Sequence, residues 1–289
     1  MNRRERVLAA IGGRQVDHVP SLFSLHFPRE QAVGGAAVEA HVRFYNETGV
    51  DVLKIMNEHL EPAIGPVRAP EDWRAVKGYH MDAPFLRAQA DIISNILEKV
   101  EKPVYSLATI HGVCASCIHP IEGAYGYARA REILLETLRS RPDIMLDVHK
   151  RVTDTMCELA QACIRAGADG IYYAALGGER HYYTDEEHDR FLKPFDLQIM
   201  QAAREAGGQV RADGPAVHAF EPLGDTPQGR RERPLKGVVG ILAGQRVPDG
   251  HEPIVSRQKE VLPLQKGRPL RHGLHERRGM LGHAGLFKD

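Results

Sequence analysis

The feature that most restricts the fold of this chain is a regular alternation of short β-rich runs with longer helical segments. Runs rich in β-branched, aromatic and other apolar residues occur at 19–27, 50–56, 103–110 and 168–176. Between them, apolar residues recur at helical spacing over 36–48, 84–100 and 142–166. Strands that alternate with helices of this length build βαβ units, so the pattern predicts a parallel sheet.

Both ends of the alternating region carry helix signals. Val7, Leu8 and Ile11 have the spacing of a short amphipathic helix. Thr184 and Glu187 have the spacing of a capping box, and Pro194 fits the first turn of a second helical piece that ends near residue 206. No GxGxxG or GxxxxGK[ST] motif follows the first β-rich run, which disfavours the nucleotide-binding types of α/β sheet.

Charge and apolar patterning limit the partners and the location. The 38 basic and 38 acidic residues balance, so no net field favours nucleic acid or an anionic membrane. The apolar run at 7–11 is too short for a secretion signal, and no run approaches the ~20 residues that span a bilayer. Four cysteines do not make a disulfide scaffold in a chain of this size. We therefore expect a cytoplasmic protein that binds neither nucleic acid nor membrane.

Several segments, taken in order, carry a family resemblance. They read RERVLAAIGGRQVDHVP near the amino terminus, TGVDVLKIMNEHLEPAIG around the second run, and IRAGADGIYYAALGG followed by YTDEEHDRFLKPFDLQIMQAAREAGG around the fourth. Their order and spacing over residues 1–210 resemble the uroporphyrinogen decarboxylase superfamily. The resemblance implies an α/β fold, a (β/α)8 TIM barrel spanning 1–289 as a single domain. It also implies an enzyme, either a carboxy-lyase acting on a tetrapyrrole or a corrinoid-linked methyltransferase.

The sequence departs from both branches of that family. The decarboxylases carry a signature close to PVWxMRQAGR, but this chain has PSLFSLHFPR, in which Leu25 takes the first arginine position and only Arg29 remains. Losing a guanidinium that grips carboxylates argues against uroporphyrinogen itself as substrate. The methyltransferases hold zinc with a His-x-Cys after strand five and a later cysteine, but here no cysteine follows Cys163.

Catalytic candidates are expected at the carboxyl ends of the strands, where barrel enzymes carry their sites. Asp51 matches the strand-two aspartate that contacts pyrrole NH groups in the decarboxylases, and the alternative is an aspartate that caps a turn. Glu58 and His59 follow the same run, and either could transfer a proton, with a solvated loop as the alternative. We predict Asp51 and Glu58 as catalytic residues.

Substrate-binding candidates come from the loops after the first, second and fourth runs. A plain solvated loop is the alternative for most of them, and packing against helices is the alternative for one tyrosine of the pair 172–173. The predicted binding residues are His26, Arg29, Lys54, Asn57, Tyr173 and Glu179.

One segment has metal-binding residue types. His111, Cys114, Cys117 and His119 form H-x2-C-x2-C-x-H after the third run, and soft ligands of this kind suit zinc. Structural zinc usually needs two separated ligand pairs, whereas nine residues hold all four here. We therefore expect no cofactor and a packing or loop role for this segment, with zinc or a redox Cys-x-x-Cys pair as the alternatives. The expected partners are a small-molecule substrate and, as the resemblance implies, a tetrapyrrole or a corrinoid protein.

The last part of the chain, 211–289, has a different character. Glycine and proline rise there to about a quarter of positions, and all tyrosines and Trp73 lie before it. GLHERRGML near the end is again similar to the family's strand-seven stretch, but strand eight has no candidate. We expect a disturbed reading frame, or another departure from the family, between 211 and about 270. The unpaired strand edges would leave a marginally stable or aggregation-prone protein, or one rescued by dimerisation across the gap. The alternative is an inactive or truncated family member that serves as a binding module or has no function.

Overall fold

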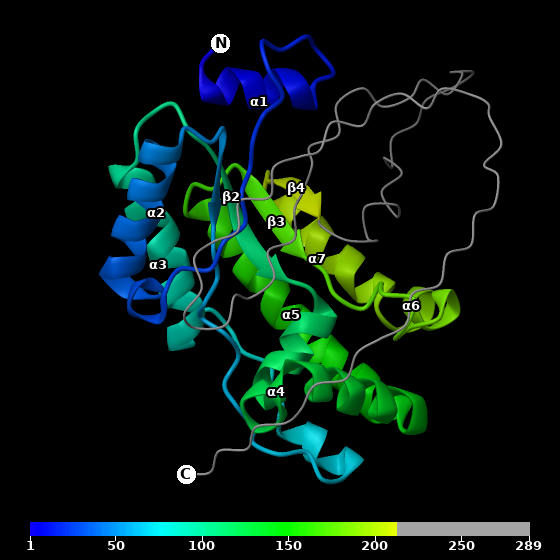
Figure 1. Cartoon of the computed structure of the whole chain (residues 1–289). Coiled ribbons are helices and arrows are strands. Elements are labelled where there is room, and N and C mark those ends of the chain that lie inside the picture. Colours follow the sequence, from blue (N-terminus) through cyan, green and yellow to red (C-terminus); the bar gives the residue numbers. More distant parts are fainter. Residues whose placement is uncertain (213–289) are drawn as a thin grey trace, which may run out of the picture. The chain divides into compact units, whose positions relative to one another are not determined.

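The computed structural model describes residues 1–212, which form a parallel α/β sheet with helices (Figure 1). The four strands are β1 (Val52–Ile55), β2 (Tyr105–His111), β3 (Gly170–Ala174) and β4 (Gln209–Ala212), in the order β1-β2-β3-β4. All three neighbouring pairs are parallel. The expected parallel α/β architecture is therefore confirmed in this region. A complete eight-stranded barrel is not shown, and strands six to eight, the proposed frame disturbance and residues 213–289 lie outside the described residues.

One expected strand is absent from the sheet within residues 1–212. Residues 19–27 form no strand, although the Ser21 carbonyl accepts hydrogen bonds from the backbone amides of Asp51 and Val52, both at 3.1 Å. The segment therefore follows the β1 edge, but its backbone–backbone hydrogen bonds to that edge are confined to this one carbonyl. The prediction of a strand at 19–27 was wrong, because the segment does not form the regular hydrogen-bond ladder of a strand. Apolar composition alone does not specify which segment a strand pairs with.

The helices cover most of the remaining described chain. They are α1 (Arg3–Ile11), α2 (Gly34–Thr48), α3 (Pro84–Lys99), α4 (Val113–Ser140), α5 (Pro142–Arg165), α6 (Asp185–Phe191) and α7 (Lys193–Glu205), with 3-10 turns η1 (Arg29–Gln31) and η2 (Pro70–Ala75). The predicted capping box at α6 is present, because the Thr184 side chain accepts from the Glu187 amide while the Glu187 carboxylate accepts from the Thr184 amide. None of the described helices is long and apolar enough to cross a membrane.

Strand alternation divides the sheet into two unlike faces. The main core joins the helices to one face, with Leu53, Ile110 and Tyr173 among its strand residues. A smaller cluster on the other face contains Val52, Tyr105, Leu107 and Tyr172, together with Val7 of α1. In a closed barrel this second face is the interior, so its side chains lead toward the barrel mouth.

An ion pair ties α1 to the amino end of β1. Asp51 is 1% exposed and accepts from the Ser21 amide at 2.8 Å and the Ser21 hydroxyl at 3.1 Å. Its other oxygen pairs with Arg6 of α1, which also binds Asp17 at 2.6 Å. Buried charges of this kind need the full set of partners that surrounds them here.

The same device is repeated two strands further on. Asp169 precedes β3 and accepts from the Ser106 amide at 3.0 Å and the Ser106 hydroxyl at 3.3 Å, and Arg4 of α1 pairs with it at 2.5 Å. Each aspartate thus links a neighbouring strand segment to an arginine of α1. Helix α1 is fixed by this repeat across the amino ends of the strands.

Candidate active site at the carboxyl end of the sheet

A buried lysine faces the inner side of the sheet near the end of β1. Lys54 is 8% exposed and its ammonium donates to the Ser24 hydroxyl. The same nitrogen lies 4.2 Å from the centre of the Tyr172 ring on β3, a cation–π contact. Ser24 belongs to the segment beside β1, so three parts of the chain hold this cation. A lysine in this position can bind an anionic substrate group at the mouth.

His111 ends β2 at the same edge. Its ring contacts the His119 ring with centroids 4.6 Å apart, and it makes no hydrogen bond within residues 1–212. Burial first, and then the positive charges of His119, Lys54 and His26, hold the pKa of His111 well below its ordinary value. The imidazole is therefore neutral near pH 7, and its conjugate acid is a strong proton donor.

Two histidine–carboxylate pairs flank His111. The His119 Nδ1 lies 2.9 Å from Glu61 Oε2, and Glu61 is 8% exposed. The His26 Nδ1 lies 2.5 Å from Glu58 Oε1, with His26 about half exposed. A carboxylate hydrogen-bonded to Nδ1 fixes the orientation of the imidazole and leaves Nε2 available for a hydrogen bond or for proton transfer. The edge thus joins His26, Lys54 and Glu58, all predicted from the sequence, with two histidines that had been considered only as metal ligands.

Of two further predicted binding residues, Asn57 is buried in the turn after β1 and Arg29 is exposed. Asn57 is 2% exposed, and its Oδ1 accepts from the His59 amide at 3.1 Å, which shapes the turn after β1. Arg29 is exposed in the turn η1 and makes no ion pair within the described part of the chain. Asn57 positions the neighbouring loop, and Arg29 stays available for an anion.

The predicted tyrosine, Tyr173, faces the helices and not the side of the sheet that carries Lys54. Tyr173 is fully buried on the helix side, where its hydroxyl donates to Asp196 Oδ1 at 2.5 Å. Tyr172 faces Lys54 instead. Strand alternation fixes the opposite orientation of neighbours, but the sequence does not say which parity points inward.

Asp51 and Glu179 also occupy structural positions. Asp51 lies before β1, at the amino end of the sheet, and is occupied by Arg6 and Ser21. It is therefore separated by the length of β1 from the residues around His111. Glu179 closes the loop after β3, since it accepts from the Gly177 amide at 2.8 Å and pairs with Arg131 at 2.7 Å.

The four residues considered for zinc do not act as one ligand set. Cys114 and Cys117 lie fully buried on α4, and burial raises the pKa of the Cys114 thiol to about 12. The Cys114 sulfur lies 3.5 Å from the Tyr183 hydroxyl. No group of three potential metal-ligand side chains is assembled within residues 1–212.

Comparison with known proteins gives a likeness in fold. No protein-family model matches the chain, and no curated protein matches its sequence significantly. Among solved structures, a methyltransferase from Methanosarcina mazei is similar with a TM-score of 0.54 and 15% identity, over 73% of this chain and 69% of that chain. At this identity the likeness describes the fold alone, and the described part of this chain shares the α/β architecture of that methyltransferase.

Proposed function

We propose that the chain is an enzyme of the uroporphyrinogen decarboxylase superfamily that carries out proton-transfer chemistry, as a carboxy-lyase, on a small anionic substrate. One observation carries the proposal: a neutral histidine, His111, stands beside the buried cation Lys54 at the carboxyl ends of adjacent parallel strands. Sites of α/β enzymes lie at this edge of the sheet. The likeness to a solved enzyme of similar architecture supports the same location.

The proposed roles follow from charge and position. Lys54 binds an anionic group of the substrate by a charge-assisted hydrogen bond. As the bond between the substrate carbon and its carboxylate breaks, carbon dioxide leaves and the electron pair stays on the carbon. The neutral His111 imidazole then relays a proton from solvent to that carbon: one ring nitrogen gives up its proton while the other takes one from water, which leaves hydroxide in solvent. The pairs His26–Glu58 and His119–Glu61 orient the surrounding side chains.

Release of carbon dioxide tests this proposal. The purified chain is incubated with uroporphyrinogen and with smaller pyrrole carboxylic acids, and carbon dioxide is measured directly. We expect turnover of a smaller acid, because Leu25 replaces the arginine that the tetrapyrrole decarboxylases carry. His111→Asn should lower kcat by about 10²-fold or more, the contribution of a positioned general acid. Lys54→Met should mainly raise KM.

A matched control is available in an exposed histidine that takes no part in the proposed reaction. His80 is an exposed histidine paired with Glu158 at 2.6 Å, so His80→Asn should leave turnover unchanged. Wild-type turnover in His111→Asn would contradict the assigned role. No carbon dioxide from any of these acids, combined with tight tetrapyrrole binding, would favour the binding-module alternative.

Methyl transfer is the second candidate, and the specific observation in its favour is that the similar solved structure is a methyltransferase. It would use zinc to activate a thiol and a corrinoid as methyl donor or acceptor. The described residues contribute no three-ligand cluster, so this function requires ligands from 213–289. Loss of the methyl group from methylcobalamin in the presence of a thiol and added zinc would support it over decarboxylation.

A further inference from the structure

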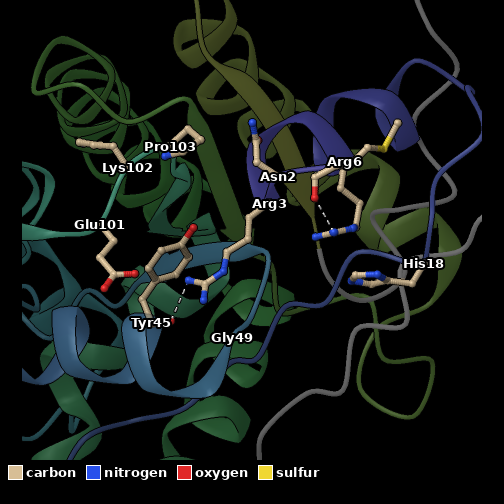
Figure 2. A pocket seen from close by; sticks show the side chains of 10 residues that line it. Asn2, Arg3, Arg6, His18, Tyr45, Gly49, Glu101, Lys102 and Pro103 are labelled. Carbon is tan, nitrogen blue, oxygen red and sulfur yellow. Dashed lines mark hydrogen bonds between the residues drawn. The ribbon is translucent and has the colours of Figure 1, made fainter.

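A second potential site lies at the amino end of the sheet, opposite the residues around His111. A cavity of about 390 Å³ opens between the start of α1, the end of α2 and the loop before β2 (Figure 2). Its volume is within the range of small-molecule sites. None of the residues assigned to the proposed reaction lines it, so it has no part in that chemistry.

One side chain of this cavity is a buried donor without a partner. Tyr45 is 0% exposed, and its hydroxyl makes no hydrogen bond within residues 1–212. Figure 2 shows the tyrosine between Arg3 and Glu101. Burial raises the pKa of Tyr45, so the hydroxyl stays protonated and able to donate at neutral pH. A buried polar group that lacks a partner carries a desolvation cost, which a ligand acceptor would remove.

The surrounding charges favour an anion. The Arg3 guanidinium lies 4.7 Å from the centre of the Tyr45 ring and donates to the Tyr45 carbonyl at 3.2 Å, which holds it at the cavity. Lys102 and His18 also line the cavity, and Glu101 is the opposing charge. Arg6 adds little, because Asp17 and Asp51 already neutralise it.

The backbone of α1 adds further donors. The helix begins at Arg3, and the Asn2 side chain caps the Glu5 amide. The amides of Arg3 and Arg4 have no hydrogen-bond partner among the described residues. Unpaired amides and the helix dipole at a helix start attract anions, and phosphate groups above all.

We propose that this cavity binds the phosphate group of a small phosphate ester. Arg3, Lys102, the Tyr45 hydroxyl and the first amides of α1 supply more donors than the two oxygens of a carboxylate can accept. Three or four phosphate oxygens can accept them. The cavity is larger than inorganic phosphate alone, and this leaves room for the esterified part of the ligand.

Calorimetric titration of the full chain, with any purification tag at the carboxyl end, tests the site. The probes are glycerol 3-phosphate, inorganic phosphate and acetate. We expect saturable binding of glycerol 3-phosphate, weaker binding of inorganic phosphate and none of acetate. Arg3→Met should weaken glycerol 3-phosphate binding about tenfold or more, the loss of one charge-assisted contact.

Two variants separate binding from damage to the fold. Tyr45→Phe should weaken binding about threefold to tenfold while leaving thermal stability equal or higher, because it removes only an unpaired buried hydroxyl. Glu101→Gln should strengthen binding about twofold to fivefold, since it removes the opposing charge. Arg129→Met is the matched control, as Arg129 is an exposed arginine of α4 bound to Glu132 and Glu136.

Several results would overturn the proposal. They are the absence of saturable phosphate-ester binding, an Arg3→Met affinity equal to that of Arg129→Met, or weaker binding in Glu101→Gln. Acetate binding as tight as that of glycerol 3-phosphate would overturn the assignment to phosphate.

Discussion

Asp196 of α7 offers a direct measurement of what a buried carboxylate costs this fold. It is 4% exposed, and its Oδ1 accepts from both the Tyr173 hydroxyl at 2.5 Å and the Val113 amide at 3.0 Å. Val113 is the first residue of α4, so the carboxylate also lies at a helix start. Burial, opposed by these two hydrogen bonds, raises the pKa of Asp196 from 3.8 to about 6.

The direction of the pH effect follows from proton binding. Between pH 3.8 and about 6 the folded state holds this proton more tightly than the unfolded state. The free energy of unfolding therefore decreases as pH rises through that window, and the loss is complete above about pH 6. A shift of this size corresponds to about 3 kcal/mol. The helix dipole favours the charged form, but its contribution of about 2 kcal/mol or less is smaller.

Asp196→Asn removes the charge and keeps the acceptor. Because both hydrogen bonds meet at Oδ1, an amide oxygen can accept both, provided that its amino group takes the Oδ2 position. Urea unfolding at several pH values from 4 to 8 should show equal stabilities at pH 4. The variant should gain on the wild type with rising pH, by up to about 3 kcal/mol at pH 8.

Two outcomes separate the competing effects. If Asp196→Asn is less stable than the wild type at pH 8 by more than about 1 kcal/mol, the carboxylate is stabilised by its donors and the reasoning from burial fails. Asp143→Asn is the control, because exposed Asp143 bound to Arg141 has a lowered pKa and should give the opposite slope.

Three further predictions use other described residues. His149 is fully buried, and burial lowers its pKa to about 4, so the free energy of unfolding of the protein decreases as pH falls from 6.5 to about 4. His149→Asn keeps a donor toward the Phe191 carbonyl and should remove this loss of about 3 kcal/mol, as measured by unfolding at acid pH. Asp51→Asn should lower the free energy of unfolding by about 3 kcal/mol or more, because it leaves Arg6 without a buried partner. Asp17→Asn removes the exposed partner of Arg6 and should lower it by about 1 kcal/mol or less. Equal effects of the two substitutions would contradict the argument from the buried pair. Metal analysis of the purified chain should find no zinc that is lost on Cys114→Ser/Cys117→Ser substitution, since both thiols are buried inside α4.

The alternation of strand and helix patterns predicted most of the described architecture because burial is periodic. The runs at 50–56 and 168–176 contain β1 and β3, the run at 103–110 covers β2 except for its last residue, and the apolar spacing at 142–166 marks α5. Residues 19–27 were also predicted as a strand but form none. Whether an apolar run joins a ladder depends on partners elsewhere in the chain, which local composition does not contain.

The site was predictable in part. The structure brings Lys54, Glu58 and His26 to one edge, as position along the strands predicted, since parallel strands end together. Residue type alone suggested zinc for the segment that contains His111, although its two thiols lie inside a helix. The strand parity that distinguishes Tyr172 from Tyr173 could have been read by matching it to Lys54, but only with the register between β1, β2 and β3.

The position of Asp51 shows why an aspartate in a strand motif needs its partners before it can be given a role. Asp51 and Asp169 each precede a strand, accept from a serine of the neighbouring segment and pair with an arginine of α1. Two aspartates with the same contacts at the same end of the sheet are explained by one structural requirement, the attachment of α1.

The surroundings of Asp51, at the amino end of the sheet, differ from those of His111, at the carboxyl end, in a way that suits the first to stability and the second to catalysis. Charges around Asp51 are matched by Arg6, Asp17 and Ser21, which leaves little capacity for a substrate. At the carboxyl edge, the His111 ring makes no hydrogen bond within the described residues and has its pKa lowered first by burial. A neutral imidazole beside a buried cation can change its protonation during a reaction, whereas a saturated ion pair is suited to holding the fold. The contrast therefore favours the carboxyl end of the strands, where α/β enzymes place their sites, for the proposed reaction.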